Sequence, residues 1–316
     1  MLILWISLGV IAVALLVLGG AFYCYKRVFY IPDRTPLGED EYELPDGEEY
    51  EAHREQIIEW IKATRTMPHE RVCIRSRDGL KLCGKYYEYQ AGAPIELLFH
   101  GYRGSGERDL SGGVERCFKL GRNALLIDQR AGGESEGNVT TFGIKEKEDC
   151  LEWIRFAIER FGKDVLLFVG GISMGAATVL MVSAEELPEN VVCILADSAY
   201  TSPKEIIQKV IRDMKLPAKL VYPFVRLGAI LFGKFDPDAY SPLQAVERAR
   251  VPIVFLHGDA DGFVPFAMSE RLYAHCASKK AFVALPNAGH GLGYPVAPDL
   301  YLQALKDFEI ECKTAR

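Results

Sequence analysis

The sequence predicts an α/β fold in which helices cover both faces of a mostly parallel sheet. Short, almost wholly apolar segments recur from about residue 95 onward, and segments with helical periodicity separate them. Continuous apolar strands of this kind are typical of parallel sheets that are buried on both faces. The chain has 316 residues, of which 49% are hydrophobic, and this length fits one large domain with an appendage.

A hairpin precedes the predicted parallel strands. Its two strands, 71–76 and 80–89, flank a turn that contains Asp78 and Gly79. The parallel strands are expected at 95–100, 123–128, 165–171, 191–197, 251–258 and 281–286. Helices are expected at about 108–121, 145–162, 174–186 and 297–311, and Gly162 gives the second of them a clear end.

The first 25 residues predict a membrane anchor. Leu2 to Tyr25 carry no charge, and a helix of about 20 apolar residues crosses the hydrocarbon core of a bilayer. A cleaved signal peptide is the alternative, but no Lys or Arg precedes the apolar run, which is also long for such a peptide. Lys26, Arg27 and Arg34 follow the span, so the positive-inside tendency places the rest of the chain in the cytoplasm.

Residues 26–55 are interpreted as an acidic linker, and residues 56–316 as the folded domain. Within the linker, residues 33–55 contain ten Asp or Glu against two Arg, which is typical of a solvated segment. Ile57, Trp60 and Ile61 then predict an amphipathic helix that packs on the domain. Because the linker accounts for the net charge of −6, no basic face suggests a nucleic-acid partner.

The eight cysteines allow two interpretations. They include no C-x-x-C pair and lack the spacing of metal ligands, so the simplest interpretation is eight free thiols in a reducing compartment. However, Cys73 and Cys83 flank the predicted hairpin turn, and a disulfide across the hairpin is the alternative.

A candidate nucleophile stands at the end of one predicted strand. Polar and glycine residues follow six of the strands, at the sheet edge where α/β proteins bind ligands. At one of these ends the segment 171–175, Gly-Ile-Ser-Met-Gly, leads into an alanine-rich helix. A serine on so sharp a turn has a strained backbone and tolerates only small neighbours, and the turn lifts its hydroxyl above the sheet. Ser173 is therefore the expected nucleophile, and the alternative is a serine that caps an ordinary helix.

Three strand-end segments, "FHGYRGSG", "DQRAGGESEG" and "HGDADGFVP", resemble the α/β-hydrolase fold family. Within that family they are similar to a bacterial group related to serine aminopeptidases and monoacylglycerol lipases, often tied to the membrane by an N-terminal helix. The resemblance covers about residues 70–312. It implies an α/β-hydrolase fold with a helical lid insertion, an N-terminal transmembrane helix and serine hydrolase activity.

A serine hydroxyl needs a base, and the base needs an acid. His290 in "NAGHG" follows the last strand and is the expected base. The resemblance assigns the acid to Asp261, with Asp259 bracing the same loop, while Asp197 is a second candidate one strand earlier. Ser173, Asp261 and His290 then stand in the chain order that this fold uses.

The expected oxyanion hole consists of two backbone donors. One is the N–H of Met174, directly after the serine. The other is assigned by the resemblance to Tyr102, in a glycine-rich loop that His100 helps to shape. Asp128 and Arg130, in the loop after the next strand, are expected to be a structural charge pair that braces the oxyanion loop.

Residues 203–240 are expected to form a lid. More than fifty residues separate the strands that end at Asp197 and begin at Val251, and two apolar helices are expected between them. Such a lid would roof an acyl pocket. It could also touch a bilayer, since Lys215, Lys219, Arg226 and Lys234 suit an interfacial position. Ordinary core packing of helices is the alternative explanation for most of its apolar residues.

These residues together predict the hydrolysis of carboxylic esters, with lipid-like or small acyl groups, through an acyl-enzyme. A peptidase or amidase with the same triad is the alternative, and an inactive scaffold is disfavoured because no triad member is missing. This chemistry needs no metal or organic cofactor, so none is expected.

Overall fold

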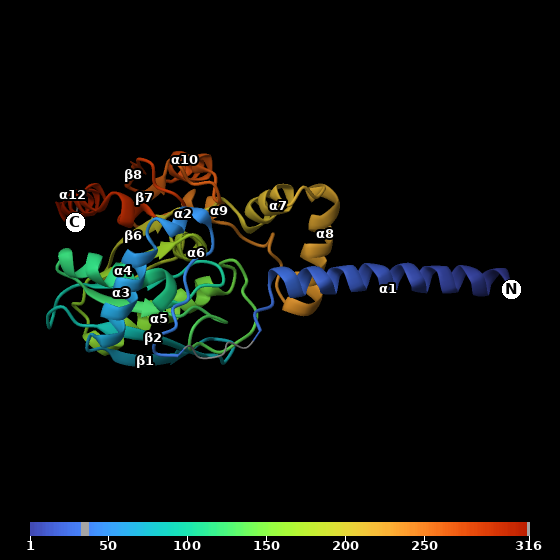
Figure 1. Cartoon of the computed structure of the whole chain (residues 1–316), viewed down its shortest axis with the longest axis horizontal. Helices are drawn as coiled ribbons and strands as arrows, with labels where there is room; N and C mark the ends of the chain where they lie inside the picture. The colour runs from blue at the N-terminus through green and yellow to red at the C-terminus, as the bar shows by residue number, and fades with distance from the viewer. Residues whose placement is uncertain (33–37, 315–316) are drawn as a thin grey trace.

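The computed structural model describes residues 1–32 and 38–314, and one eight-stranded sheet lies at its centre (Figure 1). The strands are β1 (Glu70–Arg75), β2 (Lys81–Tyr87), β3 (Ile95–Phe99), β4 (Asn123–Ile127), β5 (Leu167–Ile172), β6 (Val191–Asp197), β7 (Ile253–Gly258) and β8 (Lys280–Leu285). Their order is β1-β2-β4-β3-β5-β6-β7-β8, and the pairings are antiparallel for β1 with β2 and for β2 with β4 and parallel for the rest. The predicted fold class and each predicted strand are therefore confirmed.

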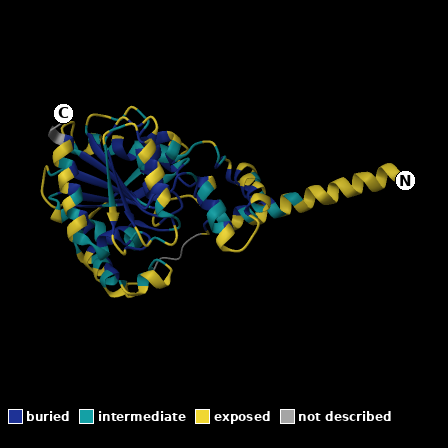
Figure 2. Cartoon of the chain, turned by 90° about the horizontal axis from the view of Figure 1, so that it is seen from above, coloured by how far each residue is buried: buried dark blue, intermediate teal, exposed yellow. Residues whose placement is uncertain are grey.

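Helices cover both faces of this sheet. One face carries α4 (Gly106–Lys119) and α12 (Pro298–Thr314), and the other carries α5 (Glu146–Phe161), α6 (Met174–Val182) and α10 (Phe266–His275). Two short helices, α9 (Pro242–Val246) and α11 (Gly293–Val296), complete the layers. Neighbouring residues of β3 serve opposite faces, since Leu97 packs with Trp153 of α5 and Leu98 packs with Leu110 of α4. Figure 2 shows the result, a buried sheet between helices that are exposed on their outer sides.

The hairpin at the start of the sheet carries a disulfide. The register of β1 and β2 places Cys73 opposite Cys83, and the two are bonded. The interpretation of all eight cysteines as free thiols is therefore wrong. The physical reason is local, because the turn at Asp78 and Gly79 brings two cysteines ten residues apart to directly facing positions.

The N-terminal helix α1 (Leu2–Val28) projects away from the domain (Figures 1 and 2). Most of its length is exposed, although its mean hydropathy is 2.8 over its most apolar 18 residues. Its C-terminal end is different, because Ala21 and Tyr25 are buried and so is Phe29, which directly follows the helix. The helix is thus joined to the fold at one end. Arg34, used above to orient the span, lies outside the described residues.

The segment 203–240, called the lid below, contains two helices and a π-turn. These are α7 (Pro203–Asp213), α8 (Ala218–Gly228) and η1 (Ala229–Gly233). Their buried side chains form one apolar cluster with Tyr25 and Phe29 at the end of α1 and with Phe142, Met174 and Tyr200 of the domain. The lid therefore packs between the N-terminal helix and the domain.

Residues 45–60, called the strap below, lie against the domain. They contain α2 (Glu48–Glu51) and the start of α3 (Arg54–Thr66). Trp60 donates from Nε1 to Glu115 Oε2 at 2.7 Å, and the hydroxyl of Tyr50 donates to the carbonyl oxygen of His290 at 2.7 Å. Most residues of 46–55 are exposed, as expected for a solvated segment. Tyr50 and Trp60 are half-buried, however, and their hydrogen bonds hold the strap against parts of the domain that are far away in the sequence.

Candidate active site

Ser173 lies on the sharp turn between β5 and α6. Its φ of 57° is in the left-handed region, which costs a residue other than glycine about 1–3 kcal/mol. A Cβ at Gly171 would lie 2.3 Å from the carbonyl carbon of Gly175, and a Cβ at Gly175 would lie 2.0 Å from the carbonyl oxygen of Phe99. Glycine is required at both positions, so these two residues allow the turn that holds the serine at the carboxyl edge of the sheet.

His290 and Asp261 meet beside this turn. The Nδ1 atom of His290 lies 2.7 Å from Oδ2 of Asp261, and Oδ1 of Asp261 accepts hydrogen bonds of 2.8 Å from the N–H groups of Phe263 and Val264. Burial alone would raise the pKa of Asp261, but hydrogen bonds from His257 and His290 outweigh this effect and hold that pKa well below its usual range. The carboxylate is therefore charged at neutral pH and can orient the imidazole ring.

His257 is a neighbour of Asp261 that the sequence analysis missed. Its Nε2 atom lies 3.1 Å from Asp261 Oδ2, and its Nδ1 atom lies 2.6 Å from the hydroxyl of Ser269. The imidazole is fully buried, so it acts on the carboxylate and cannot reach a substrate. The only sequence signal was its place at the end of a strand, four residues before the acid.

The two other acids considered from the sequence have different partners. Asp197 accepts hydrogen bonds from Tyr301 (2.9 Å) and Ser198 (3.0 Å), and Asp259 accepts one from the N–H of Asn287 at 2.7 Å. Asp259 thus braces its loop, as expected. Of the three carboxylates, Asp261 is the one that the structure brings to the ring of His290.

The loop after β3 passes directly beside the serine. A Cβ at Gly101 would lie 3.6 Å from Cβ of Ser173. The loop is fixed by Asp109, whose Oδ2 accepts from the N–H of Gly101 at 2.9 Å, and a Cβ at Gly104 would collide with that same carboxylate at 2.0 Å. Tyr102, the expected oxyanion donor, follows Gly101 in this loop and lines the cavity at Ser173.

His100 and Met174 complete the surroundings of this loop. The ring of His100 lies 2.7 Å from the carbonyl oxygen of Gly101 through Nδ1, and its Nε2 accepts from the N–H of Gln129 at 2.9 Å. Met174 is the first residue of α6, and the first N–H groups of a helix have no acceptor within it. A free backbone donor is therefore available immediately after Ser173.

Asp128 and Arg130 do not form the expected charge pair. Arg130 is bound to Asp149 at 2.7 Å and to Asp78 at 2.9 Å, which ties the loop to α5 and to the hairpin. Asp128 instead accepts from the N–H of Gly106 at 2.7 Å, at the start of α4. Both residues are structural, but the chain turns at Arg130, which faces α5 and the hairpin, so only Asp128 reaches the segment that follows the oxyanion loop.

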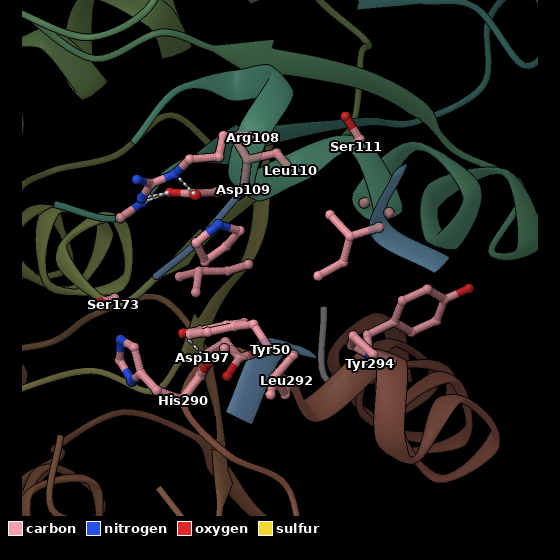
Figure 3. A pocket seen from close by; sticks show the side chains of 18 of the residues that line it. Tyr50, Arg108, Asp109, Leu110, Ser111, Ser173, Asp197, His290, Leu292 and Tyr294 are labelled. Carbon is pink, nitrogen blue, oxygen red and sulfur yellow. Dashed lines mark hydrogen bonds and ion pairs between the residues drawn. The ribbon is translucent and has the colours of Figure 1, made fainter. Parts of the chain in front are cut away.

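A cavity of about 180 Å³ opens at the serine (Figure 3). Ser173 and His290 lie at one end of it, and apolar side chains that include Leu110, Leu292 and Tyr294 continue its wall away from them. Four residues of the strap and α3 line it as well: Pro45, Tyr50, Ile57 and Trp60. None of its lining residues comes from 203–240. The expectation that the lid roofs the acyl pocket therefore fails for this cavity. The lid packs on α1 instead, and the strap lines the cavity where the lid was expected.

Several solved structures that resemble this fold are named as esterases. The Pyrococcus furiosus esterase Pf2001 superposes with a TM-score of 0.63 and 21% identity, covering 89% of this chain and 97% of that one. The chain therefore has the α/β-hydrolase fold. Est1E from Butyrivibrio proteoclasticus, solved with ferulic acid, gives a TM-score of 0.58 and 19% identity over 77% of this chain and 99% of that chain.

No family model matches the chain, but several curated proteins are similar to it in sequence. The protein bem46 of Schizosaccharomyces pombe is 25% identical, and the match covers 96% of this chain and 91% of bem46. The YqkD protein of Bacillus subtilis is 25% identical over 60% of this chain, and the lysophosphatidylserine lipase ABHD12 of Danio rerio is 26% identical over 62% of it. These last two matches span 62% and 51% of the relatives' own lengths.

The described residues offer no site for a metal ion. Within 1–32 and 38–314, no group of three or more His, Cys, Asp or Glu side chains is arranged to hold one. The chemistry available at this edge of the sheet is that of the serine, the imidazole, the carboxylate and the backbone N–H groups.

Proposed function

We propose that this α/β-hydrolase cleaves carboxylic esters through an acyl-enzyme on Ser173, with His290 as the base and Asp261 as the acid. The observation that carries the proposal is the 2.7 Å contact between His290 and Asp261 at the rim of the cavity that also contains the strained Ser173. This combination of a nucleophile elbow and an oriented imidazole is the geometry of nucleophilic acyl transfer.

The proposed reaction follows from these contacts. His290 accepts the proton of the Ser173 hydroxyl as the oxygen attacks the ester carbonyl, and Asp261 stabilises the imidazolium that forms. The N–H groups of Met174 and Tyr102 stabilise the negative charge on the carbonyl oxygen. His290 then gives its proton to the departing alcohol, and a water molecule, activated by the same ring, hydrolyses the acyl-enzyme.

The size of the cavity limits the acyl group. Its volume is about 180 Å³. An apolar cavity of about 150 Å³ holds benzene, so a group of roughly six to eight carbon atoms fits here. We therefore propose esters of short to medium acyl or aryl acids as the preferred substrates. A long acyl chain would need the strap to move.

Two carboxylates line the cavity, and both are already engaged. Asp109 is bound to Arg108 at 2.6 Å, and Asp197 is bound to Tyr301 at 2.9 Å. A peptidase selective for free N-termini would need a carboxylate available for the substrate ammonium group. These contacts favour esters over peptides with free N-termini.

The test uses labelling and turnover together. Wild-type protein is treated with a fluorophosphonate probe and assayed with p-nitrophenyl esters from acetate to palmitate, and aminoacyl-nitroanilides are assayed in parallel. Ser173→Ala should abolish labelling and lower ester turnover by at least about 10³-fold while the melting temperature stays close to that of the wild type. Labelling that persists in this variant would refute the assignment of the nucleophile.

We also propose that α1 anchors the protein in a membrane as a single span. Its apolar residues are exposed over nearly the whole helix, and soluble proteins rarely leave so large an apolar surface uncovered. Its buried C-terminal end favours a helix that stays attached over a signal peptide that is removed.

Two observations bear on which side of the membrane the domain occupies. Lys26 and Arg27 follow the span and favour the cytoplasm, which is the location we propose. The disulfide between Cys73 and Cys83 is of a kind that persists mainly in oxidising compartments and favours the opposite side. A C-terminal fusion to green fluorescent protein, which fluoresces when it folds in the cytoplasm, decides between them, and a fusion to alkaline phosphatase gives the reciprocal signal.

A further inference from the structure

The helix α8 crosses α1 at a particular level. A Cβ at Gly228 would lie 2.3 Å from the carbonyl oxygen of Ala21, and a Cβ at Gly20 would lie 3.1 Å from the ring of Phe224. Figure 1 shows α8 running across α1 rather than along it, close to the C-terminal end of α1. The residues of α1 before this crossing, 2–20, span about 28 Å as a helix, which is close to the thickness of a hydrocarbon core of about 30 Å. If α1 spans a bilayer, α8 lies where the hydrocarbon ends.

The two sides of α8 differ in their surroundings. Ala218, Tyr222, Val225 and Ala229, which recur at helical spacing, are buried in the apolar cluster that the lid forms with the end of α1 and the domain. Large apolar residues on and around the other side stay exposed. They are Leu216, Leu220, Ile230, Leu231 and Phe232, with exposed fractions between 36% and 69%.

This exposed side is continuous with the apolar surface of α1. The ring of Phe232 packs edge-on against Phe22 with centroids 5.1 Å apart, and Phe22 is itself 48% exposed. Lys215 and Lys219, near the start of α8, are exposed and can reach lipid headgroups. An apolar side with cations near it, lying across the end of an apolar span, is the arrangement of a helix in a membrane interface.

We propose that α8 and η1 lie in the membrane interface as a second contact with the bilayer, with the side chains of Leu220, Leu231 and Phe232 inserted at the boundary between headgroups and acyl chains. The proposal rests on the proposed membrane anchor. The lid does not line the cavity, and this proposal gives it another role: the lid holds the domain against the lipid surface in a fixed orientation.

Hydrogen bonds also link the oxyanion loop to the C-terminal end of α1. The hydroxyl of Tyr102 donates to the carbonyl oxygen of Val28 at 2.6 Å, and Nη2 of Arg103 donates to the carbonyl oxygen of Arg27 at 2.9 Å. The last turn of α1, the lid and the loop beside Ser173 are therefore one connected body. A membrane contact at α8 fixes how the active-site edge of the sheet is presented to the bilayer.

Tryptophan quenching in vesicles tests the proposal with the full chain. The native Trp5 near the start of α1 reports whether the anchor is inserted, because lipids brominated on their acyl chains quench tryptophan near the hydrocarbon. In a Trp5→Phe background, Leu220→Trp places a probe on the exposed side of α8, and Ile310→Trp places a matched probe on α12, where Ile310 is 61% exposed. The background protein supplies the signal of Trp60 and Trp153.

We expect Trp5 to be quenched in the wild type. The added tryptophan of Leu220→Trp should lose about half of its emission in brominated vesicles, since an interfacial helix buries its apolar side about 5–10 Å. The added tryptophan of Ile310→Trp should be unaffected. Leu231→Trp provides a second probe if the first variant does not fold.

Two results would overturn the proposal, and they are distinguishable. If Trp5 is quenched but neither lid probe is quenched more than the α12 probe, the anchor stands and the lid contact is refuted. A lid that binds another protein instead would give this result. If Trp5 itself is not quenched, the anchor and the lid contact both fall, while the ester hydrolysis test is independent of either outcome.

Discussion

The strap and the lid are both helical segments near Ser173, but they contact different parts of the molecule. The strap lines the cavity, and its Tyr50 hydroxyl holds the carbonyl oxygen of His290. The lid lines none of that cavity and packs its buried side on α1 and on the domain around Phe142. Proximity to a nucleophile therefore does not decide which segment selects the substrate. The side chains that face the cavity decide it, and here they come from the segment with the more polar sequence.

The largest expected effect comes from a substitution in the proposed catalytic triad, which lies near both segments. Asp261→Asn should lower kcat/KM for p-nitrophenyl hexanoate by about 10⁴-fold, because the imidazole loses the partner that fixes its tautomer. Steady-state kinetics beside circular dichroism checks this. Asp259→Asn is the matched control in the same loop and should stay within about 10-fold of the wild type. If the two variants lose activity equally, Asp261 has no special role.

A matched pair of enlargements tests which segment selects the acyl group. Ile57→Phe fills the cavity from α3 and should lower the ratio of kcat/KM for hexanoate over acetate by at least about 10-fold. Val225→Phe overpacks the buried side of the lid and should cost about 1–3 kcal/mol of stability with no change in that ratio. Selection of the acyl group by the strap is refuted if the lid variant changes the chain-length preference and the α3 variant does not.

Two tyrosine hydroxyls provide a finer version of the same test. Tyr50→Phe removes the hydrogen bond to the carbonyl of His290, and a bond worth about 1 kcal/mol predicts a loss of about 5-fold in kcat. Tyr102→Phe keeps its backbone N–H but loses the hydrogen bond to Val28. We therefore expect its melting temperature in vesicles to fall while its kcat falls less than that of Tyr50→Phe. Equal kinetic losses in the two variants would mean that the oxyanion loop positions the base as much as the strap does.

The smallest expected effect is on acid stability. Because the pKa of Asp261 is lower in the folded protein than in the unfolded chain, its charge stabilises the fold above the unfolded value of about 4. This contribution disappears as the pH falls from about 4 toward the lower folded value. The melting temperature of Asp261→Asn should therefore depend less steeply on pH between about 5 and 3 than that of the wild type. Asp299→Asn, which changes an exposed carboxylate, should follow the wild type.

Local signals in the sequence were sufficient for much of the fold and for the elbow. Apolar runs locate the strands because parallel strands are buried on both faces, and the glycines around Ser173 follow from the closeness of the turn to Phe99. The packing of the helix that carries Ile57 and Trp60 was predicted, but the contact of Tyr50 was missed because residues 33–55 have the composition of a solvated segment. The position of the strap depends on Tyr50 and Trp60 meeting residues 240 and 55 positions away in the sequence. His257 was missed for the same reason, since its contact with Asp261 exists only once the loop has folded.

The burial of Tyr25 and Phe29 has a practical consequence for anyone who wants a version of the enzyme that needs no detergent. Cutting the chain after α1 would remove Tyr25 from the apolar cluster that contains Phe142. It would also remove the carbonyl groups of Val28 and Arg27, which accept hydrogen bonds from Tyr102 and Arg103. The cut belongs inside the helix, near Gly19, so that its last two turns stay with the catalytic body.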